Sequence, residues 1–357
     1  MNTPLDLTLS ATDLTVAICD IPSVSGDERT LADAVEHTLR QFGHLAVYRD
    51  GDAVVARTDR PGAAGRVVIA GHLDTVPIAG NLPVRREGDV LWGRGTVDMK
   101  GGVAVMLRLA AHVTEPARDV TYVFYDNEEV AAEHNGLGRV SRSHPRWLAG
   151  EFAVLMEPTS ATVEGGCNGT LRAEVTVRGT AAHSARWWMG RNAIHDVAPV
   201  LDRLRAYQPA QVEVDGLVYR EGLSAVGIDG GIAGNVIPDR CTVSVNYRFA
   251  PDKSEQEAFG HVRDVFDGFD VVLVDSAPAA RPGLDEPAAA AFVAAVGGTV
   301  RAKEGWTDVA RFSEFGVPAV NYGPGDPLLA HADDERVDVG DIETCETRMR
   351  AWLGSAG

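Results

Sequence analysis

Short apolar runs alternate with amphipathic segments in the first and last parts of the chain. The apolar runs predict short strands at 66–70, 119–125, 152–156 and 317–322. A helical spacing of apolar positions between and beyond them predicts helices at 28–42, 99–113, 286–296, 308–315 and 339–354. Strands that are apolar on both faces and separated by helices are typical of a mostly parallel sheet with helices on both faces. These parts of the chain therefore predict an α/β domain.

The middle of the chain has a different pattern. Residues 171–178 alternate between apolar and polar side chains, which indicates a strand with one exposed face. The pattern then predicts a helix at 192–206, strands at 217–228 and 240–249, a helix at 254–266 and a strand at 269–275. This β-α-β-β-α-β order is typical of an α+β ferredoxin-like domain. We expect this domain, residues 171–284, to be inserted between two parts of the α/β domain, residues 1–170 and 285–357.

Composition and charge limit the kinds of partner. The chain has 357 residues, a globular composition and a formal net charge of −18, which repels the phosphates of nucleic acid. No apolar run approaches the roughly 20 residues that span a bilayer, and the first 15 residues lack the pattern of a signal peptide. We expect a cytoplasmic protein with no nucleic-acid or membrane partner.

The four cysteines are widely separated and form no C-x-x-C pair; they are Cys19, Cys167, Cys241 and Cys345. This spacing does not favour a disulfide framework or a cysteine zinc site. We expect them to be small buried side chains.

Acids and histidines follow several predicted strands or lie in the loops of the α/β domain. In chain order they are His72, Asp74, Asp98, Glu128, Glu129, Glu157 and His331. Sites in an open parallel sheet form outside the carboxyl ends of the strands, so the topology predicts that these residues meet at one edge.

The residue types favour metal chemistry. Two histidines and three carboxylates suit zinc, with cobalt or manganese as alternatives, and can hold two divalent ions about 3.5–4 Å apart. A further carboxylate can remove a proton from the attacking water. The alternative is that the histidines are ordinary structural residues and that Glu128-Glu129 is a solvated charge pair. The pattern alone leaves both interpretations open.

The residues of these segments resemble the motifs of a known family. The segments are Gly71-His72-Leu73-Asp74-Thr75-Val76-Pro77, residues 93–102, Asp126-Asn127-Glu128-Glu129, Met156-Glu157-Pro158 and the loop of His331. In order and spacing they resemble the di-zinc amidohydrolases that include aminoacylase, acetylornithine deacetylase and succinyl-diaminopimelate desuccinylase. The resemblance extends over nearly the whole chain.

The resemblance implies a role for each residue. Asp98 would bridge two metal ions, with His72 and Glu157 completing one site and Glu129 and His331 the other. Glu128 would be the general base, and Asp74 would orient His72. A cis peptide between Asp98 and Met99 is implied as well.

The resemblance also makes the inserted domain a lid that mediates a homodimer. Residues 179–185 resemble a motif in which the histidine, here His183, stabilises the oxyanion of the substrate carbonyl, often from the partner subunit. Residues 234–239 resemble the segment whose asparagine, Asn235, contacts substrate. Arg248 resembles an arginine that binds the terminal carboxylate of the substrate; otherwise it is a surface residue.

Three segments, at 165–170, 183–195 and 305–312, look like those of actinobacterial-type succinyl-diaminopimelate desuccinylases. This likeness predicts a small N-acylated amino acid as substrate and adds Thr307 and Gly325 to the expected substrate-binding residues. One departure is Cys167-Asn168, where proteobacterial relatives carry an arginine pair; Arg186 is the candidate for the missing cation.

The expected reaction is hydrolysis of N-succinyl-L,L-2,6-diaminopimelate. The alternatives are an acetylornithine or acetyl-lysine deacetylase, a dipeptide-cleaving metallo-exopeptidase, and an inactive metal-binding dimeric module. The presence of Glu128 beside a full ligand set argues against the inactive module, which needs no base.

Overall fold

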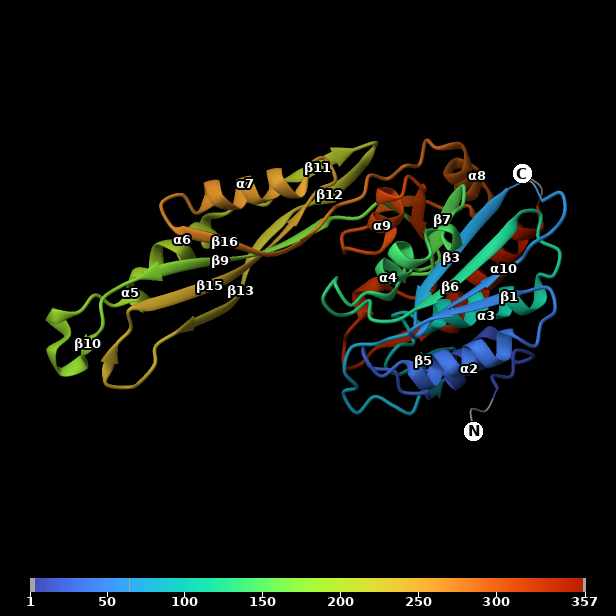
Figure 1. The fold of residues 1–357 in the computed structure, drawn as a ribbon, viewed down its shortest axis with the longest axis horizontal. Coiled ribbons are helices and arrows are strands. Elements are labelled where there is room, and N and C mark those ends of the chain that lie inside the picture. Colours follow the sequence, from blue (N-terminus) through green and yellow to red (C-terminus); the bar gives the residue numbers. More distant parts are fainter. Residues whose placement is uncertain (1–3, 64, 356–357) are drawn as a thin grey trace. The chain divides into compact units, whose positions relative to one another are not determined.

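The computed structural model describes residues 4–63 and 65–355, which form two compact units (Figure 1). The larger unit takes in the chain up to Gly165, residues 282–301 and the chain from Thr307, and the smaller unit takes in residues 166–281 and 302–306. Residues 302–306, expected in the α/β domain, belong to the smaller unit because Trp306 Nε1 donates to the Pro278 carbonyl at 3.1 Å.

The larger unit is built on a mixed sheet of eight strands in the order β1-β2-β6-β3-β7-β18-β8-β17. The strands are β1 (Ala46–Asp50), β2 (Ala53–Arg57), β3 (Arg66–His72), β6 (Asp119–Tyr125), β7 (Phe152–Leu155), β8 (Val163–Gly165), β17 (Val300–Ala302) and β18 (Ala319–Asn321). The four adjacent strands β6, β3, β7 and β18 are parallel. Their carboxyl ends therefore lie along one edge of the sheet. A separate small sheet contains β4 (Arg85–Glu87), β5 (Val90–Trp92) and β19 (Arg336–Asp338).

Helices cover both faces of the eight-stranded sheet. On one face, Val67 and Ile69 of β3 share a core with α1 (Ala11–Cys19), α2 (Arg29–Leu39), α3 (Lys100–His112), α8 (Pro287–Val296) and α10 (Val339–Gly354). Val68 and Ala70 are also fully buried and face the other way, where α4 (Gly136–Ser143) and α9 (Val309–Glu314) contact the sheet. The expected fold class is therefore confirmed for this unit. None of the helices described between residues 4 and 355 is long and apolar enough to cross a membrane.

The smaller unit contains a four-stranded antiparallel sheet in the order β13-β15-β9-β16. Its strands are β9 (Gly169–Arg178), β13 (Gly222–Gly230), β15 (Arg240–Phe249) and β16 (Asp270–Ala277), and its helices are α5 (Ala193–Asp196), α6 (Ala198–Ala206) and α7 (Glu255–Val265). This β-α-β-β-α-β order is the expected ferredoxin-like one. A hairpin of β11 (Gln211–Val214) and β12 (Leu217–Arg220) and a two-residue pairing of β10 (Ala182–His183) with β14 (Val236–Ile237) are added to it.

Two predicted elements of the smaller unit were wrong in extent. The helix expected at 192–206 is divided into α5 and α6, because Pro199 lacks the N–H that a continuous helix requires. The strand expected at 217–228 is divided at Glu221, whose buried carboxylate accepts from Tyr247 Oη and Ala250 N, each at 2.9 Å. The strands on either side of Glu221 pair in different sheets.

Candidate metal centre

The parallel strands bring three of the predicted segments to one edge. His72 is the last residue of β3 and pairs with Tyr125 at the end of β6, three residues before Glu128. Ala70 pairs with Leu155 at the end of β7, two residues before Glu157. Side chains that are far apart in the sequence thus begin from adjacent strand ends.

Asp98 comes from the loop that leads into α3. Gly95 has φ of +82°, and a Cβ at Gly102 would lie 2.3 Å from the Met156 carbonyl oxygen, so both positions require glycine. The Asp98–Met99 peptide is cis, which confirms that prediction. Glu335 fixes the loop, because its Oε1 accepts from Val97 N at 3.0 Å and from Asp98 N at 3.2 Å.

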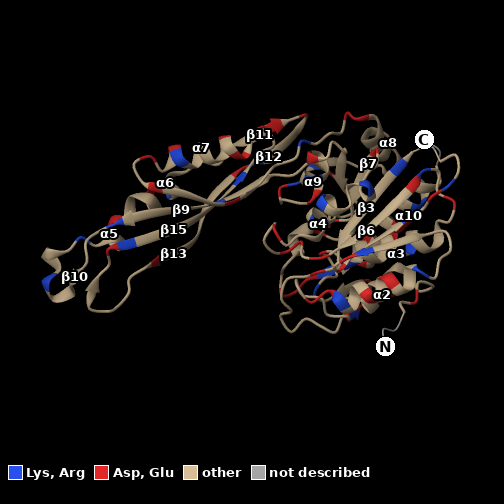
Figure 2. Ribbon diagram, in the orientation of Figure 1, with Lys and Arg blue, Asp and Glu red and all other residues tan. Residues whose placement is uncertain are grey.

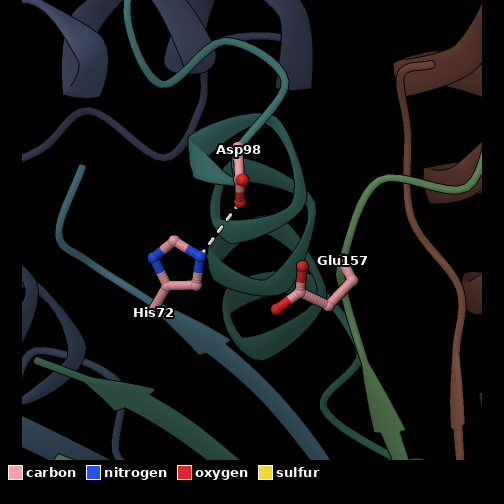
Figure 3. A group of neighbouring side chains, drawn as sticks. All are labelled: His72, Asp98 and Glu157. Carbon is pink, nitrogen blue, oxygen red and sulfur yellow. Dashed lines mark hydrogen bonds and ion pairs between the residues drawn. The ribbon is translucent and has the colours of Figure 1, made fainter. Parts of the chain in front are cut away.

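The two carboxylate oxygens of Asp98 face two different histidines. His72 Nε2 lies 3.1 Å from Asp98 Oδ1, and His331 Nε2 lies 3.3 Å from Asp98 Oδ2 and 2.9 Å from Glu129 Oε1. Glu157 lies beside the first pair (Figure 3). Three groups have ligand atoms within 4.8 Å of one another: His72, Asp98 and Glu157; Asp98, Glu129 and His331; and His72, Glu128 and Glu129.

This donor set fits two divalent cations that share one carboxylate. Imidazole nitrogens and carboxylate oxygens are ordinary ligands of zinc, and Asp98 offers one oxygen to each group. Burial opposes protonation of His72, but its hydrogen bonds to Asp74 and Asp98 outweigh burial and raise its pKa well above the usual value. Hydrogen bonds to Asp98 and Glu129 raise the pKa of His331 to about 10. Because metal-ligating imidazole is neutral, a cation bound here would have to displace these protons.

Asp74 holds more than the ring of His72. His72 Nδ1 lies 3.0 Å from the Asp74 carbonyl oxygen and 3.4 Å from Oδ1 of its carboxylate. That carboxylate accepts the backbone N–H groups of Glu128 and Glu129, both at 3.0 Å, and the hydroxyl of Ser25 at 2.7 Å. One buried carboxylate therefore fixes a metal-ligand candidate and the segment that carries the expected base.

The environment of Glu128 suits a proton carrier. Burial, and then the nearby carboxylates, raise its pKa well above the usual value, although the His72 charge opposes this. A carboxyl group with a raised pKa binds a proton more readily than a solvated carboxyl group does and can release it again.

The expected substrate-binding residues lie in several places. His183 pairs with Val236, Ser184 N donates to the Asn235 carbonyl at 2.9 Å, and Arg186 lies in the 3₁₀ segment Ser184–Met189. His183, Asn235 and Arg186 thus gather at one end of the smaller unit. Arg248 lies near the other end of β15, where it pairs with Thr170 and Gly222.

Thr307 and Gly325 lie in the larger unit, and both are buried. The Thr307 hydroxyl donates to Asn321 Oδ1 at 2.9 Å, and Gly325 N donates to Asp341 Oδ2 at 3.2 Å. A Cβ at Gly325 would lie 3.2 Å from Val97 Cγ2, beside Asp98. Gly325 therefore borders the loop of the metal centre, whereas the hydroxyl of Thr307 is directed to another side chain of the protein.

The sequence did not identify several acids that hold the site. Glu28 Oε1 accepts from Asn127 N at 3.0 Å, next to Glu128. Glu335 holds Asp98, and Asp308, fully buried, binds Asn135 and Arg311. Glu335 stands in the run Asp333-Asp334-Glu335, a pattern typical of a solvated charge run. The available signal for Asp308 was its place in the family-like segment 305–312.

Comparison with known proteins decides the family. Residues 68–354 match the model of peptidase family M20/M25/M40. The chain belongs to this family. It is 45% identical over 360 residues to the succinyl-diaminopimelate desuccinylase of Corynebacterium glutamicum, covering 98% of this chain and 97% of that one. It is 56% identical over 353 residues to a Mycobacterium tuberculosis protein provisionally named as the same enzyme, covering 98% and 99%.

Solved structures of more distant proteins share the fold of this M20 chain. A tripeptidase from Staphylococcus aureus superimposes with a TM-score of 0.79 at 17% identity, covering 99% of both chains. A dinuclear metal-binding peptidase of the M20 family from Bacillus subtilis gives 0.70 at 16% identity and covers 96% of both chains. At these identities the likeness establishes the fold alone, with both units included.

Proposed function

We propose that this chain hydrolyses N-succinyl-L,L-2,6-diaminopimelate to succinate and L,L-2,6-diaminopimelate, a step of diaminopimelate and lysine biosynthesis in the cytoplasm. The observation that carries amide hydrolysis is the arrangement around Asp98, whose two oxygens face separate ligand groups beside Glu128. The choice of substrate is supported by the relative of that name from Corynebacterium glutamicum, which the chain matches over its length.

The residues that would hold two divalent cations, most simply zinc, form two groups that share Asp98. His72 and Glu157 complete one group, and Glu129 and His331 complete the other. Such cations, when bound, polarise the carbonyl and lower the pKa of water. Asp74 keeps His72 and the Glu128-Glu129 backbone in place throughout.

Glu128 moves the proton. Its carboxylate takes a proton from the water whose oxygen attacks the amide carbon, and it returns that proton to the amine nitrogen as the C–N bond breaks. His183 stabilises the negative oxygen that forms on the amide carbon. His183 Nδ1 accepts from Ala185 N at 3.1 Å, so the proton of a neutral ring lies on Nε2, which can donate to the oxyanion.

Arg248 is the proposed partner of the succinyl carboxylate. It is exposed, and among the residues that the structure describes it forms no ion pair and no side-chain hydrogen bond. Two other arginines of the smaller unit, Arg220 and Arg281, are already paired, with Glu304 at 3.3 Å and with Asp215. A guanidinium can bind a carboxylate through two parallel hydrogen bonds, which an acetyl group cannot form.

The active form is proposed to be a homodimer in which His183 serves the partner's site. His183 lies beyond the Arg240 end of β15, and Arg248 is eight residues further along the strand, a span of about 27 Å. A succinylated amino acid is shorter than this span, so one subunit cannot present both residues to one substrate molecule. Strand β13, an unpaired edge with exposed Val226 and Ile228, provides a surface for a second copy.

Turnover of three substrate classes tests the activity. The zinc-loaded protein is assayed on N-succinyl-diaminopimelate, on N-acetylornithine and on a panel of dipeptides. We expect the highest kcat/KM on the succinyl substrate. A higher value on acetylornithine or on a dipeptide would reassign the substrate. If none of the three substrate classes is hydrolysed, the proposed activity is wrong.

Mixed dimers test the shared site. Glu128→Gln and His183→Ala variants are each expected to be nearly inactive, but mixing them creates dimers with one intact site if His183 acts in the partner. Random mixing of subunits should then restore about a quarter of the wild-type activity. If mixing restores nothing although mass spectrometry detects mixed dimers, His183 acts within its own subunit.

A further inference from the structure

The loop that carries Glu128 and Glu129 is closed at its neck. This loop, residues 126–135 and here called the base loop, connects β6 to α4. Gly136 N donates to the Asp126 carbonyl at 2.8 Å, and Arg139 donates to both carboxylate oxygens of Asp126 at 2.7 and 3.1 Å. The start of the base loop is therefore tied to the helix that comes after its end.

Asp308 holds the other side of this neck. Its side chain is fully buried, and its two oxygens accept from Asn135 Nδ2 at 3.0 and 3.3 Å. Arg311 Nε donates to the same carboxylate at 2.6 Å. Asn135 in turn caps α4, because its Oδ1 accepts from Gly138 N at 2.9 Å. The last residue of the base loop is thus fixed by a carboxylate that lies far along the sequence.

A carboxylate at this position needs an explanation beyond stability. Burying a charged pair is often no more favourable than packing apolar side chains of similar volume. Asp308 and Arg311 fix a position instead. Asn135 donates hydrogen bonds to the Asp308 carboxylate, which Arg311 also holds, and these bonds define where the base loop ends. The other face of the loop is held by Asp74 and Glu28, which accept its backbone N–H groups.

We propose that Asp308 is a positioning residue for the catalytic base: through Asn135 it fixes the neck of the base loop and so keeps Glu128 in reach of substrate. This inference rests on the proposed role of Glu128. Asp308 belongs to none of the three ligand groups around Asp98 and His72. It is the second residue after the chain leaves the smaller unit.

An exchange of the two partners tests the hydrogen bond itself. Asp308→Asn places two amides together and Asn135→Asp places two carboxylates together, whereas the double variant restores one carboxylate and one amide. Because displacement of a reacting group by about 1 Å can cost 10²-fold, each single variant should lose about 10- to 100-fold in kcat with little change in KM. The double variant should recover most of that loss.

Hydrogen exchange gives a readout that does not depend on the substrate. The amides of Asn127, Glu128 and Glu129 are bonded to Glu28 and Asp74, and Asp308→Asn should speed their exchange by about 10-fold or more. The double variant should return it to the wild-type rate. Asp119→Asn is the matched control, since Asp119 is buried at the opposite end of β6 and accepts from Thr58 Oγ1 at 2.8 Å. It should lower stability and leave kcat and these three amides unchanged.

The outcomes separate the two proposals. If the wild type does not hydrolyse the succinyl substrate, the proposed function fails, and the exchange rates still decide the role of Asp308. Wild-type kcat and exchange in Asp308→Asn would overturn the inference, as would a lower kcat without faster exchange at residues 127–129. If Asp308→Asn does not fold, a folded double variant with wild-type exchange and turnover supports the inference, and one that lacks both overturns it.

Discussion

The sheets of the two units place their functional residues in opposite ways. In the larger unit, residues from His72 to His331 meet around Asp98 with ligand atoms within 4.8 Å of their neighbours. In the smaller unit, His183 lies beyond one end of β15, and Arg248 lies within the strand near its other end. Parallel strands all end at one edge and bring the loops after them together, whereas antiparallel strands end at alternate edges.

The difference indicates different roles for the two units. Both units carry Lys and Arg as well as Asp and Glu (Figure 2). The edge at which parallel strands end suits a compact centre in which one carboxylate can contact two histidines, as Asp98 contacts His72 and His331. An antiparallel sheet suits a long arm whose two ends serve two different places. Substitutions in each unit test whether chemistry belongs to the first and recognition to the second.

Glu128→Ala should have the largest effect. Loss of a general base typically lowers turnover about 10²- to 10⁴-fold, and the ligand groups that share Asp98 remain complete without Glu128. We expect kcat to fall in this range while metal content, measured by mass spectrometry of the folded protein, stays near wild type. Glu133→Ala, an exposed acid in the same loop, is the control. An empty metal site in Glu128→Ala would exchange the roles of base and ligand.

His183→Ala should have the next largest effect. Removing one donor to an oxyanion costs about 10²- to 10³-fold in kcat, and succinyl and acetyl amides both form that oxyanion. Initial rates on both substrates should therefore fall by the same factor. His195→Ala, from α5 of the same unit, should leave both rates unchanged. A loss confined to one substrate would make His183 a recognition residue.

Arg248→Ala should act on one substrate. Truncating one member of a charge pair costs about 2–5 kcal/mol, so kcat/KM on the succinyl substrate should fall roughly 30-fold or more. The rate on an acetyl analogue should change little, because that substrate lacks the carboxylate. Arg220→Ala, which removes an arginine already paired with Glu304, should spare both. Equal losses on the two substrates would remove Arg248 from the acyl pocket.

Thiol labelling compares the stability of the two units, and we expect it to show the smallest difference. Cys19 and Cys345 lie in the larger unit and Cys167 and Cys241 in the smaller, and all four are buried. Burial raises the pKa of Cys19 to about 12, and thiols react as thiolates, so the native protein should resist labelling. As urea rises, Cys167 and Cys241 should label first, since fewer buried apolar residues form the main core of the smaller unit than that of the larger. Earlier labelling of Cys19 in peptide mass spectra would reverse this order.

The sequence predicted the elements whose pattern is local. The strand at 119–125 and the helix at 339–354 have the expected bounds, because apolar spacing alone defines them. The pattern omitted α1, β1 and β2, and it joined α5 to α6 across Pro199. Short elements carry too few residues for a period to emerge.

The residues of the candidate site were likewise predictable only in part. His72, Asp98 and Glu157 stood out because their types and motifs are distinctive. Glu335 and Asp308 did not, because an acid's role depends on which distant N–H groups it accepts from. The 3.4 Å separation of the Asp74 carboxylate from His72 also showed that its shorter bonds go to Glu128 and Glu129.

The position of β18 sets the order in which the protein can be finished during synthesis. This strand lies between β7 and β8, which leave the ribosome before the whole of the smaller unit does. At the usual rate of translation, residues 166–318 take on the order of ten seconds to be made. Throughout that time β18 is missing from its place between β7 and β8, beside the segment that joins these two strands and contains Glu157. His331 is made later still. The nascent chain therefore contains Asp98, Glu128 and Glu157 before His331 is made, and the candidate metal centre is among the last parts of the molecule to be completed.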